Sequence, residues 1–218
     1  MPRIFATVPK YLVSTDFSTR PADEGEALYW QNTATATITA WHPYKAQTNV
    51  NISNQKDGYA DFDFLLAQTD ASYKDDDIKL KFYHRMAKVK YTLKQGEGIT
   101  QEELDDAKVS IAGYTSASFA GGELTGSGEG WITPTADGEA LLVPQNMSGK
   151  QFIKVSILVD GTLRDFVYTP EDGAANLESG YAYTYSITVK RTGIEVNAMC
   201  GESVSYTHLR AHETRGNL

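Results

Sequence analysis

The sequence predicts an all-β protein of the sandwich type. Three observations predict it: strand-like alternation of apolar and polar residues recurs along the chain, turn residues separate the alternating runs, and helical periodicity is nearly absent. The composition agrees, because the 218 residues include 13 tyrosines and 18 glycines and 41% of them are apolar. Such a chain suits strands joined by turns and has enough apolar residues to form a core.

The longest uninterrupted alternation before the middle of the chain runs from Ile78 to Lys94. Its apolar residues occupy even positions from Ile78 to Phe82 and odd positions from Val89 to Leu93. A one-residue change of phase moves the apolar side chains to the opposite face of a strand. We therefore expect a bulge or sharp bend near His84 to Ala87, so that one strand serves two surfaces.

The chain before this segment shows weaker patterns. Short apolar runs lie at Ile4 to Val8 and at Tyr11 to Val13. A strand is predicted over Thr33 to His42, and Pro43 should end it, because proline has no N–H to donate to a sheet. A further short apolar segment, DFDFLLAQ, lies at residues 61–68.

After Lys94 the sequence changes character. Two glycines precede Thr100 to Glu103, which form a capping-box pattern typical of a short helix. Strand alternation then starts afresh at Val109. We therefore predict a boundary within residues 95–106, with one domain over residues 1–95 and a second over residues 96–200.

The second domain contains several further predicted elements. The glycines of residues 121–130 mark a loop or hairpin, and Leu141 to Val143 is a short buried strand ended by Pro144. Asp160-Gly161 suits a type I′ turn between two alternating runs, and a two-residue loop pairs Val155 with Phe166 and Ile153 with Tyr168. The strongest strand pattern of the chain is Tyr181 to Lys190.

Charge and cysteine content exclude several classes of function. The formal net charge of -8 disfavours binding to nucleic acid or anionic lipid, and strand lysines such as Lys79, Lys81, Lys88 and Lys90 more often discourage edge pairing. Cys200 is the sole cysteine, so no internal disulfide is expected. No apolar run approaches the length of a membrane span, and the N-terminus lacks a long apolar signal region. Taken literally, these features describe a soluble intracellular chain.

No residue pattern predicts a metal or phosphate site. His84 has no cysteine, histidine or carboxylate at ligand spacing, so we interpret it as a hydrogen-bonded structural histidine. Asp61, Asp63 and the run Asp75 to Asp77 lack the glycine-interrupted loop of a calcium site and are expected to be solvated. The GSGEG run at residues 126–130 lacks the lysine and helix of a phosphate loop.

Catalytic motifs are also absent from the sequence. Glu102 and Glu103 share one short turn, where they cannot face each other across a substrate. We therefore predict no catalytic, cofactor-binding or metal-binding residues, no cofactor and no enzyme activity. Trp30, Trp41 and Trp131 could stack on sugar rings, although aromatic residues at strand positions usually fill cores.

Several segments in a fixed order resemble those of the fimbrillin-like proteins of Bacteroidota. The resemblance covers about Glu26 to Val196 and rests on the following segments: ATATITAWHPY, FDFLLAQ, LKFYHRMAKVKYTL, AKVSIAGYTSASF, LLVPQN and YAYTYSITVKRTGIEV. It implies two β-sandwich (transthyretin-like) domains, export as a lipoprotein of the outer membrane, and assembly into cell-surface fimbriae. In such assembly one subunit donates a β-strand to a groove of another.

The chain departs from the family at both ends. It has no signal peptide or lipidated cysteine near its start, and its first domain is expected to be incomplete. The segment SYTHLRAHET resembles an adaptor-derived translation, so residues 201–218 are expected to form a mobile or loosely docked tail that is foreign to the fold, and its His208 and His212 are not interpreted as metal ligands.

Two functional hypotheses follow from these observations. The first is a structural subunit or adhesin of fimbriae whose partners are other fimbrial subunits, with surface glycans or proteins as further candidates and no nucleic acid. The second is a surface carbohydrate-binding module without catalysis, based on the tryptophans.

Overall fold

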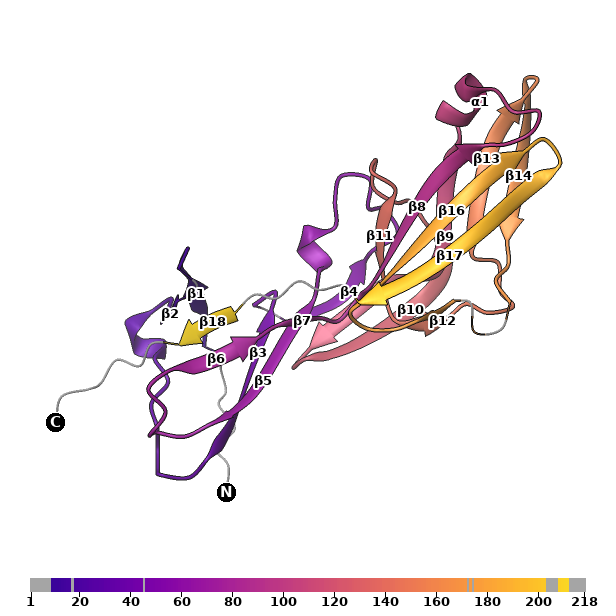
Figure 1. Ribbon diagram of the computed structural model, residues 1–218. Helices are drawn as coiled ribbons and strands as arrows, with labels where there is room; N and C mark the ends of the chain where they lie inside the picture. The colour runs from indigo at the N-terminus through magenta and orange to yellow at the C-terminus, as the bar shows by residue number, and fades with distance from the viewer. Residues whose placement is uncertain are drawn as a thin grey trace.

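The computed structural model describes residues 9–16, 18–44, 46–171, 173, 175–202 and 208–211. The molecule is elongated, with a large sandwich at one end and smaller sheets at the other (Figure 1). Nearly all of its regular structure is β-strand, which confirms the predicted all-β sandwich class. The apolar run predicted at residues 4–8 lies outside the described residues.

The larger unit, called here the C-terminal sandwich, has two sheets. In the first sheet the strand order is β11 (Glu139–Leu142), β8 (Ala87–Gln95), β16 (Tyr181–Lys190) and β17 (Gly193–Glu202). In the second sheet it is β10 (Glu123–Ile132), β9 (Lys108–Ala120), β13 (Ile153–Val159) and β14 (Thr162–Tyr168), and β4 (Gln47–Asn51) also pairs with β9. A small ribbon of β12 (Gln145–Asn146) and β15 (Asn176–Leu177) lies beside them.

Alternate side chains from both sheets fill the main core. Along β16, Tyr183, Tyr185, Ile187 and Val189 are buried while their neighbours are more exposed, as the alternation predicts. The ring of Tyr185 packs edge-on against Phe152, with ring centroids 5.4 Å apart. The strong strand prediction for residues 181–190 is therefore confirmed.

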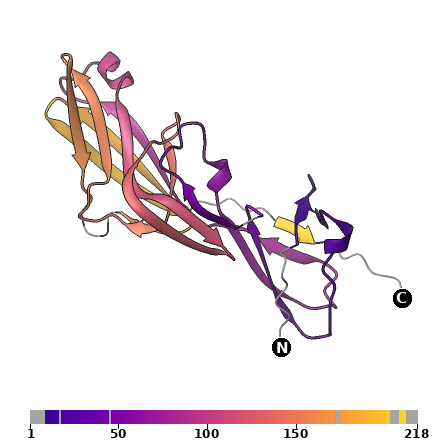
Figure 2. The same ribbon diagram turned by 180° about the vertical axis from the view of Figure 1, so that it is seen from behind.

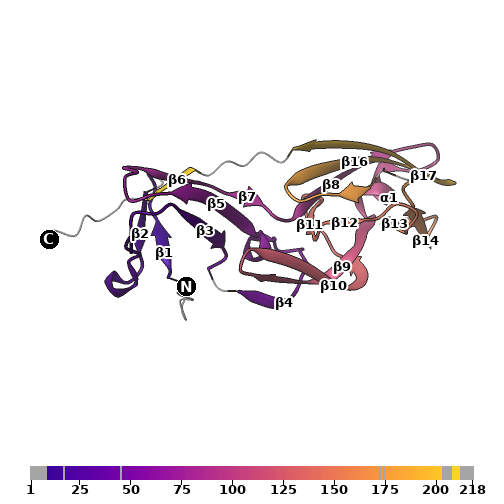
Figure 3. The ribbon, with the colours of Figure 1, turned by 90° about the horizontal axis from the view of Figure 1, so that it is seen from below.

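The smaller sheets lie at the other end of the molecule (Figure 3). One contains β1 (Tyr11–Val13), β2 (Ser18–Pro21), β18 (His208–Ala211) and β6 (Ile78–Lys81), and the other contains β3 (Ala36–His42), β5 (Leu65–Ala71) and β7 (Tyr83–His84). The short 3-10 helix η1 (Glu24–Glu26) connects β2 and β3 of this half, and η2 (Ala60–Phe62) lies between β4 of the sandwich and β5. The strand predicted at residues 33–42 is confirmed as β3, three residues shorter at its start.

The predicted bend within residues 78–94 is present. The chain leaves β6, passes through the two residues of β7, bends at Met86 and enters β8. Its second half then pairs in parallel with β16 from Lys88 to Gln95. The segment thus serves two surfaces as expected, but it does not close the first unit, because β8 is an inner strand of the C-terminal sandwich.

Residues 95–106 lie at the end of the C-terminal sandwich far from the small sheets (Figure 1). The capping box is confirmed: the Thr100 hydroxyl accepts from the Glu103 N–H, and the Glu103 carboxylate accepts from the Thr100 N–H at the start of α1 (Gln101–Asp105). Ile99 and Leu104 are buried in the main core. A boundary between two units stays a prediction, and strand pairing favours a position before Ala87 over one at residue 95.

The hairpin of β13 and β14 has the predicted register. Val155 pairs with Phe166 and Ile153 pairs with Tyr168. Asp160 and Gly161 have φ angles of 49° and 72°, as a type I′ turn requires.

Two parts of the predicted tail, residues 201–218, pair with strands of the fold. β17 continues through Glu202, and the backbone of residues 208–211 forms β18 between β2 and β6. The pattern gave no sign of these strands because strand pairing uses backbone groups and does not require alternation of side chains. His212 lies outside the described residues.

A second core joins the two ends of the molecule. Ile52, Phe62 and Phe64 pack against residues of the C-terminal sandwich, and the Phe64 and Phe119 rings stack with centroids 4.8 Å apart. The β9–β10 hairpin also reaches the small sheets (Figure 2), where Gly122 leaves room for the side chain of Leu66. Segments far apart in the sequence therefore form one continuous body.

Two tyrosines of β16 offer a matched test of this packing. The Tyr185 hydroxyl is buried without a hydrogen-bond partner among the described residues, whereas the Tyr183 hydroxyl donates to the Asn176 carbonyl and accepts from the Glu178 N–H. We expect Tyr185→Phe to raise the free energy of unfolding by about 1 kcal/mol and Tyr183→Phe to lower it by about 1 kcal/mol. Chemical denaturation of both variants measures this, and a loss of stability in Tyr185→Phe would contradict the assignment.

Candidate functional site

The side chain of Gln55 closes the outer edge of β11. Gln55 is fully buried, and its amide Nε2 donates to the carbonyls of Ile52 and Leu141 at 3.0 and 2.8 Å. Its Oε1 accepts from the Leu141 N–H at 2.8 Å. One side-chain amide therefore makes the two hydrogen bonds that a neighbouring strand would make to Leu141.

The rest of the β11 edge is closed as well. Thr135 Oγ1 accepts from the Glu139 N–H at 3.1 Å, and the Thr135 N–H donates to the Glu139 carbonyl at 2.8 Å. Just beyond the strand, the Gln145 amide donates to the Val143 carbonyl at 3.0 Å. No outward backbone group from Glu139 to Leu141 is left for another chain, so this edge cannot accept a strand without local rearrangement.

Glu139 is the centre of a charged cluster beside this edge. Its carboxylate lies 2.7 Å from Lys88 Nζ and 3.2 Å from Lys90 Nζ, and it accepts from the Tyr59 hydroxyl at 2.8 Å. Partial burial alone would raise the pKa of the Glu139 carboxyl, but the hydrogen bonds from Lys88 and Tyr59 lower it to about 2. The cluster stays ionised at neutral pH and ties the η2 loop to β8 and β11.

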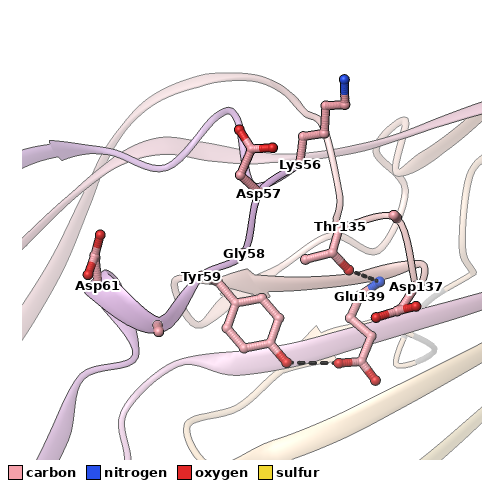
Figure 4. Close-up of a pocket in the computed structure, with 10 residues that line it drawn as sticks. Lys56, Asp57, Gly58, Tyr59, Asp61, Thr135, Asp137 and Glu139 are labelled. Carbon is pink, nitrogen blue, oxygen red and sulfur yellow. Dashed lines mark hydrogen bonds between the residues drawn. The ribbon is translucent and has the colours of Figure 1, made fainter.

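An open cleft of about 580 Å³ lies between the loop that contains Tyr59 and the turn before β11. Figure 4 shows the Tyr59 ring directed at Glu139 across this space. The other charged lining residues are exposed: Lys56, Asp57, Asp61 and Asp137. The Tyr59–Glu139 bond spans the cleft, so we interpret it as a structural junction with a solvated rim.

His84 of β7 and Asp63, just before β5, form a second polar contact, which lies within the small-sheet half beside the junction. His84 Nδ1 lies 2.7 Å from Asp63 Oδ1, and both side chains are half-buried. The hydrogen bond with Asp63 raises the pKa of the His84 imidazole above its ordinary value, although burial opposes this. On the other side, the hydroxyl of Ser179 donates to the backbone carbonyls of His84 and Arg85. The interpretation of His84 as a hydrogen-bonded structural residue agrees with these contacts.

The remaining candidate residues do not converge on one site. Asp61 lies at the cleft, whereas Asp75 accepts from the Ser72 N–H in the turn before β6. Glu103 caps α1, and residues 126–130 lie within strand β10. Among the described residues, no group of three or more His, Cys, Asp or Glu side chains could hold a metal ion, and no helix is long and apolar enough to cross a membrane.

None of the three tryptophans is fully exposed. Trp30, Trp41 and Trp131 are all half-buried. Trp41 packs against the second core, and the ammonium of Lys154 lies 4.7 Å from the centre of the Trp131 ring. Their positions agree with a packing role more than with sugar binding.

The residues that matter most to this junction were missed by the sequence patterns. Gln55 and Glu139 are separated by more than eighty positions, and neither belongs to a motif. Glutamine is normally an exposed residue, so its complete burial becomes evident only when the edge of β11 is seen.

Replacing Gln55 tests the closure of the β11 edge. We expect Gln55→Leu to lower the free energy of unfolding by about 3 kcal/mol, because the Leu141 N–H and carbonyl lose their partners while buried. Gln68→Leu, at an exposed position of β5, is the matched control and should change stability by less than about 0.5 kcal/mol. Equal stability of the two variants in urea would contradict the account.

The His84–Asp63 pair should make stability depend on pH. Because the folded state raises the pKa of His84, the stabilisation is complete below about pH 6.5 and is lost as pH rises through the folded-state pKa. With both side chains partly exposed, we expect a loss of about 1 kcal/mol. His84→Gln should flatten this dependence. Urea unfolding at a series of pH values measures the effect, and an unaltered slope in His84→Gln would reject it.

Solved structures share this fold. A protein from Bacteroides uniformis, proposed to act in cell adhesion, superposes with a TM-score of 0.68 over 84% of this chain and 79% of its own, at 23% identity. A second such protein, from Bacteroides ovatus, superposes with a TM-score of 0.60 over 86% and 76% of the two chains, at 20% identity. At these identities the likeness shows the fold alone. No curated protein matches the chain.

The sequence itself carries the family assignment. The model of the fimbrillin-like family matches residues 5–200, which is most of the 218-residue chain and includes both cores. The same range contains all the segments on which the resemblance was based. This protein belongs to the fimbrillin-like family.

Proposed function

We propose that this protein is a non-catalytic structural subunit or adhesin of cell-surface fimbriae, assembled by strand donation between subunits. The observation that carries the proposal is the match to the fimbrillin-like family over residues 5–200. The polar side chains described above, such as Gln55 and Glu139, make hydrogen bonds that hold segments of the fold together, and this supports a structural role. Its partners are other fimbrial subunits, and its location is the outer surface of the cell, with attachment to the outer membrane as a lipoprotein.

The small sheets support the strand-donation part of the proposal. Among the described residues their core has three buried members, Ala67, Leu80 and Phe82. Large apolar side chains remain exposed around them, at Val13, Leu28, Tyr29, Tyr73 and Tyr83. A four-residue strand, β18, fits between β2 and β6 through backbone pairing. A slot that holds such a short segment is suited to a strand from another chain.

The carbohydrate-binding alternative is less well supported. It was based on tryptophans that could stack on sugars, and all three are half-buried. The open cleft contains one aromatic ring, that of Tyr59, whose hydroxyl is bound to Glu139. We therefore retain adhesion to glycans only as a role that a fimbrial subunit could have in addition.

Localisation in the source cell tests the proposal. The gene is tagged with an epitope in its source cell, and fimbriae are sheared from the cells. Immunogold microscopy then locates the tag on filaments, and immunoblotting shows whether the tagged subunits run as a ladder of multimers. We expect labelled filaments and assemblies that survive mild detergent, as strand-donated subunits do. A tagged protein found only as a monomer away from filaments would overturn the fimbrial role.

A glycan array with the same tagged protein distinguishes the carbohydrate-binding alternative from the fimbrial role. Selective sugar binding that is lost in Trp41→Ala or Trp131→Ala, in a protein absent from filaments, would favour the carbohydrate-binding module.

A further inference from the structure

The edges of the C-terminal sandwich differ in whether they could accept another strand. The edge of β11 is closed by side chains, as described above. β10 and β4 are each interrupted by a positive φ angle, 66° at Gly128 and 56° at Asn49. β14 lies close to the turn end of β17, and Arg164 donates to the carbonyl of Arg191 in the β16–β17 turn. Only β17 presents a long, regular edge among the described strands of this sandwich.

The geometry of the β16–β17 hairpin identifies the free backbone groups of β17. Its turn has two residues, and Lys190 pairs with Gly193 beside it. In such a hairpin the pair next to the turn is hydrogen-bonded and the following pairs alternate. The N–H and carbonyl groups of Ala198 and Cys200 therefore point away from β16, and they have no hydrogen-bond partner among the described residues.

The far half of β17 is also uncovered on both faces. Ile194 and Val196 pack against the main core, but every residue from Asn197 to Glu202 is exposed, and Met199 is 70% exposed. We call residues 197–202 the open β17 edge. Regular unpaired strands of this kind are rare in monomers, because they pair readily with other chains.

A second open edge lies at the opposite end of the molecule. β3 is the outer strand of the small sheet β3-β5-β7, and it pairs only with β5 among the described residues. It is seven residues long, enough to match the open β17 edge. Figure 3 shows β3 and β17 in different halves of the elongated molecule, so contact between them requires two copies.

We infer that the open β17 edge of one molecule pairs with β3 of a second copy of this chain. The row of free N–H and carbonyl groups fits an extended main chain and neither a glycan nor a helix. A contact between different surfaces of identical molecules repeats head to tail, and it produces a linear chain when the rotation between neighbours does not close a ring. The inference rests on the proposed fimbrial function and adds a subunit contact beyond strand donation.

Hydrogen exchange on the purified full chain tests the contact. Cys200→Ser serves as the background in every sample, so that disulfide formation is excluded. Sedimentation velocity follows association as protein concentration rises, and mass spectrometry follows amide exchange. We expect slower exchange within residues 197–202 and 36–42 in the associated sample, and no change in β10.

Proline substitutions at two edges provide matched variants. Ala198→Pro removes an N–H that points away from β16, so pairing with β16 is kept. Leu163→Pro is the matched control, because it removes an N–H of β14 that points away from β13. We expect Ala198→Pro to weaken association at least about tenfold, the effect of losing roughly one good hydrogen bond, and Leu163→Pro to associate like the parent. Ala198→Lys is the second variant if the proline destabilises the hairpin.

Several results would overturn the inference: no association at any concentration, association without protection of residues 197–202, or undiminished association of Ala198→Pro and Ala198→Lys. The same variants in the source cell separate this inference from the proposed function. Filaments that contain Ala198→Pro at normal levels would reject the β17 contact and leave the fimbrial role intact. Absence of the unaltered protein from filaments would reject the fimbrial role itself.

Discussion

The hydrogen bonds between Gln55 and Leu141 are the constraint on which the rest of the structure depends. An edge strand as short as β11 would gain little from pairing on one side alone. Gln55 supplies the missing partner and is buried by doing so, which fixes the segment around it. Phe62 and Phe64 then reach the second core, and β5 begins where that core ends. The small sheets are thus attached to the sandwich by buried contacts and not by a flexible linker.

This arrangement agrees with the demands on a fimbrial subunit. A filament transmits force from one subunit to the next, so its subunits need stiff connections along their length. Here three sets of contacts cross the junction: the Gln55 bonds, the Glu139 cluster and the contacts of the Ser179 hydroxyl with the carbonyls of His84 and Arg85. Their chemistry differs, since the Glu139 cluster is ionic and the other two sets are neutral hydrogen bonds. The junction therefore does not depend on a single condition of pH or salt.

The sequence predicted local structure well and long-range pairing poorly. The register of the Asp160-Gly161 hairpin, the capping box at Thr100 and the bend before Ala87 all follow from short-range rules. The pairing of β8 with β16 does not, because a parallel pair joins segments almost a hundred residues apart. Because of that pairing, β8 belongs to the C-terminal sandwich and not to the first predicted domain. The Gln55 site was missed for the same reason, since a side chain that mimics a strand leaves no periodic pattern.

Exchange of the Leu141 amide proton tests the central claim most directly. If Gln55 closes the edge, this proton should exchange only through global unfolding, as slowly as the protons of the β16 ladder. In Gln55→Leu it should exchange much faster than the amide of Ile187 in β16, which is accelerated only by the loss of global stability. Fast exchange of Leu141 in the unaltered protein, or equal protection in both proteins, would contradict the account.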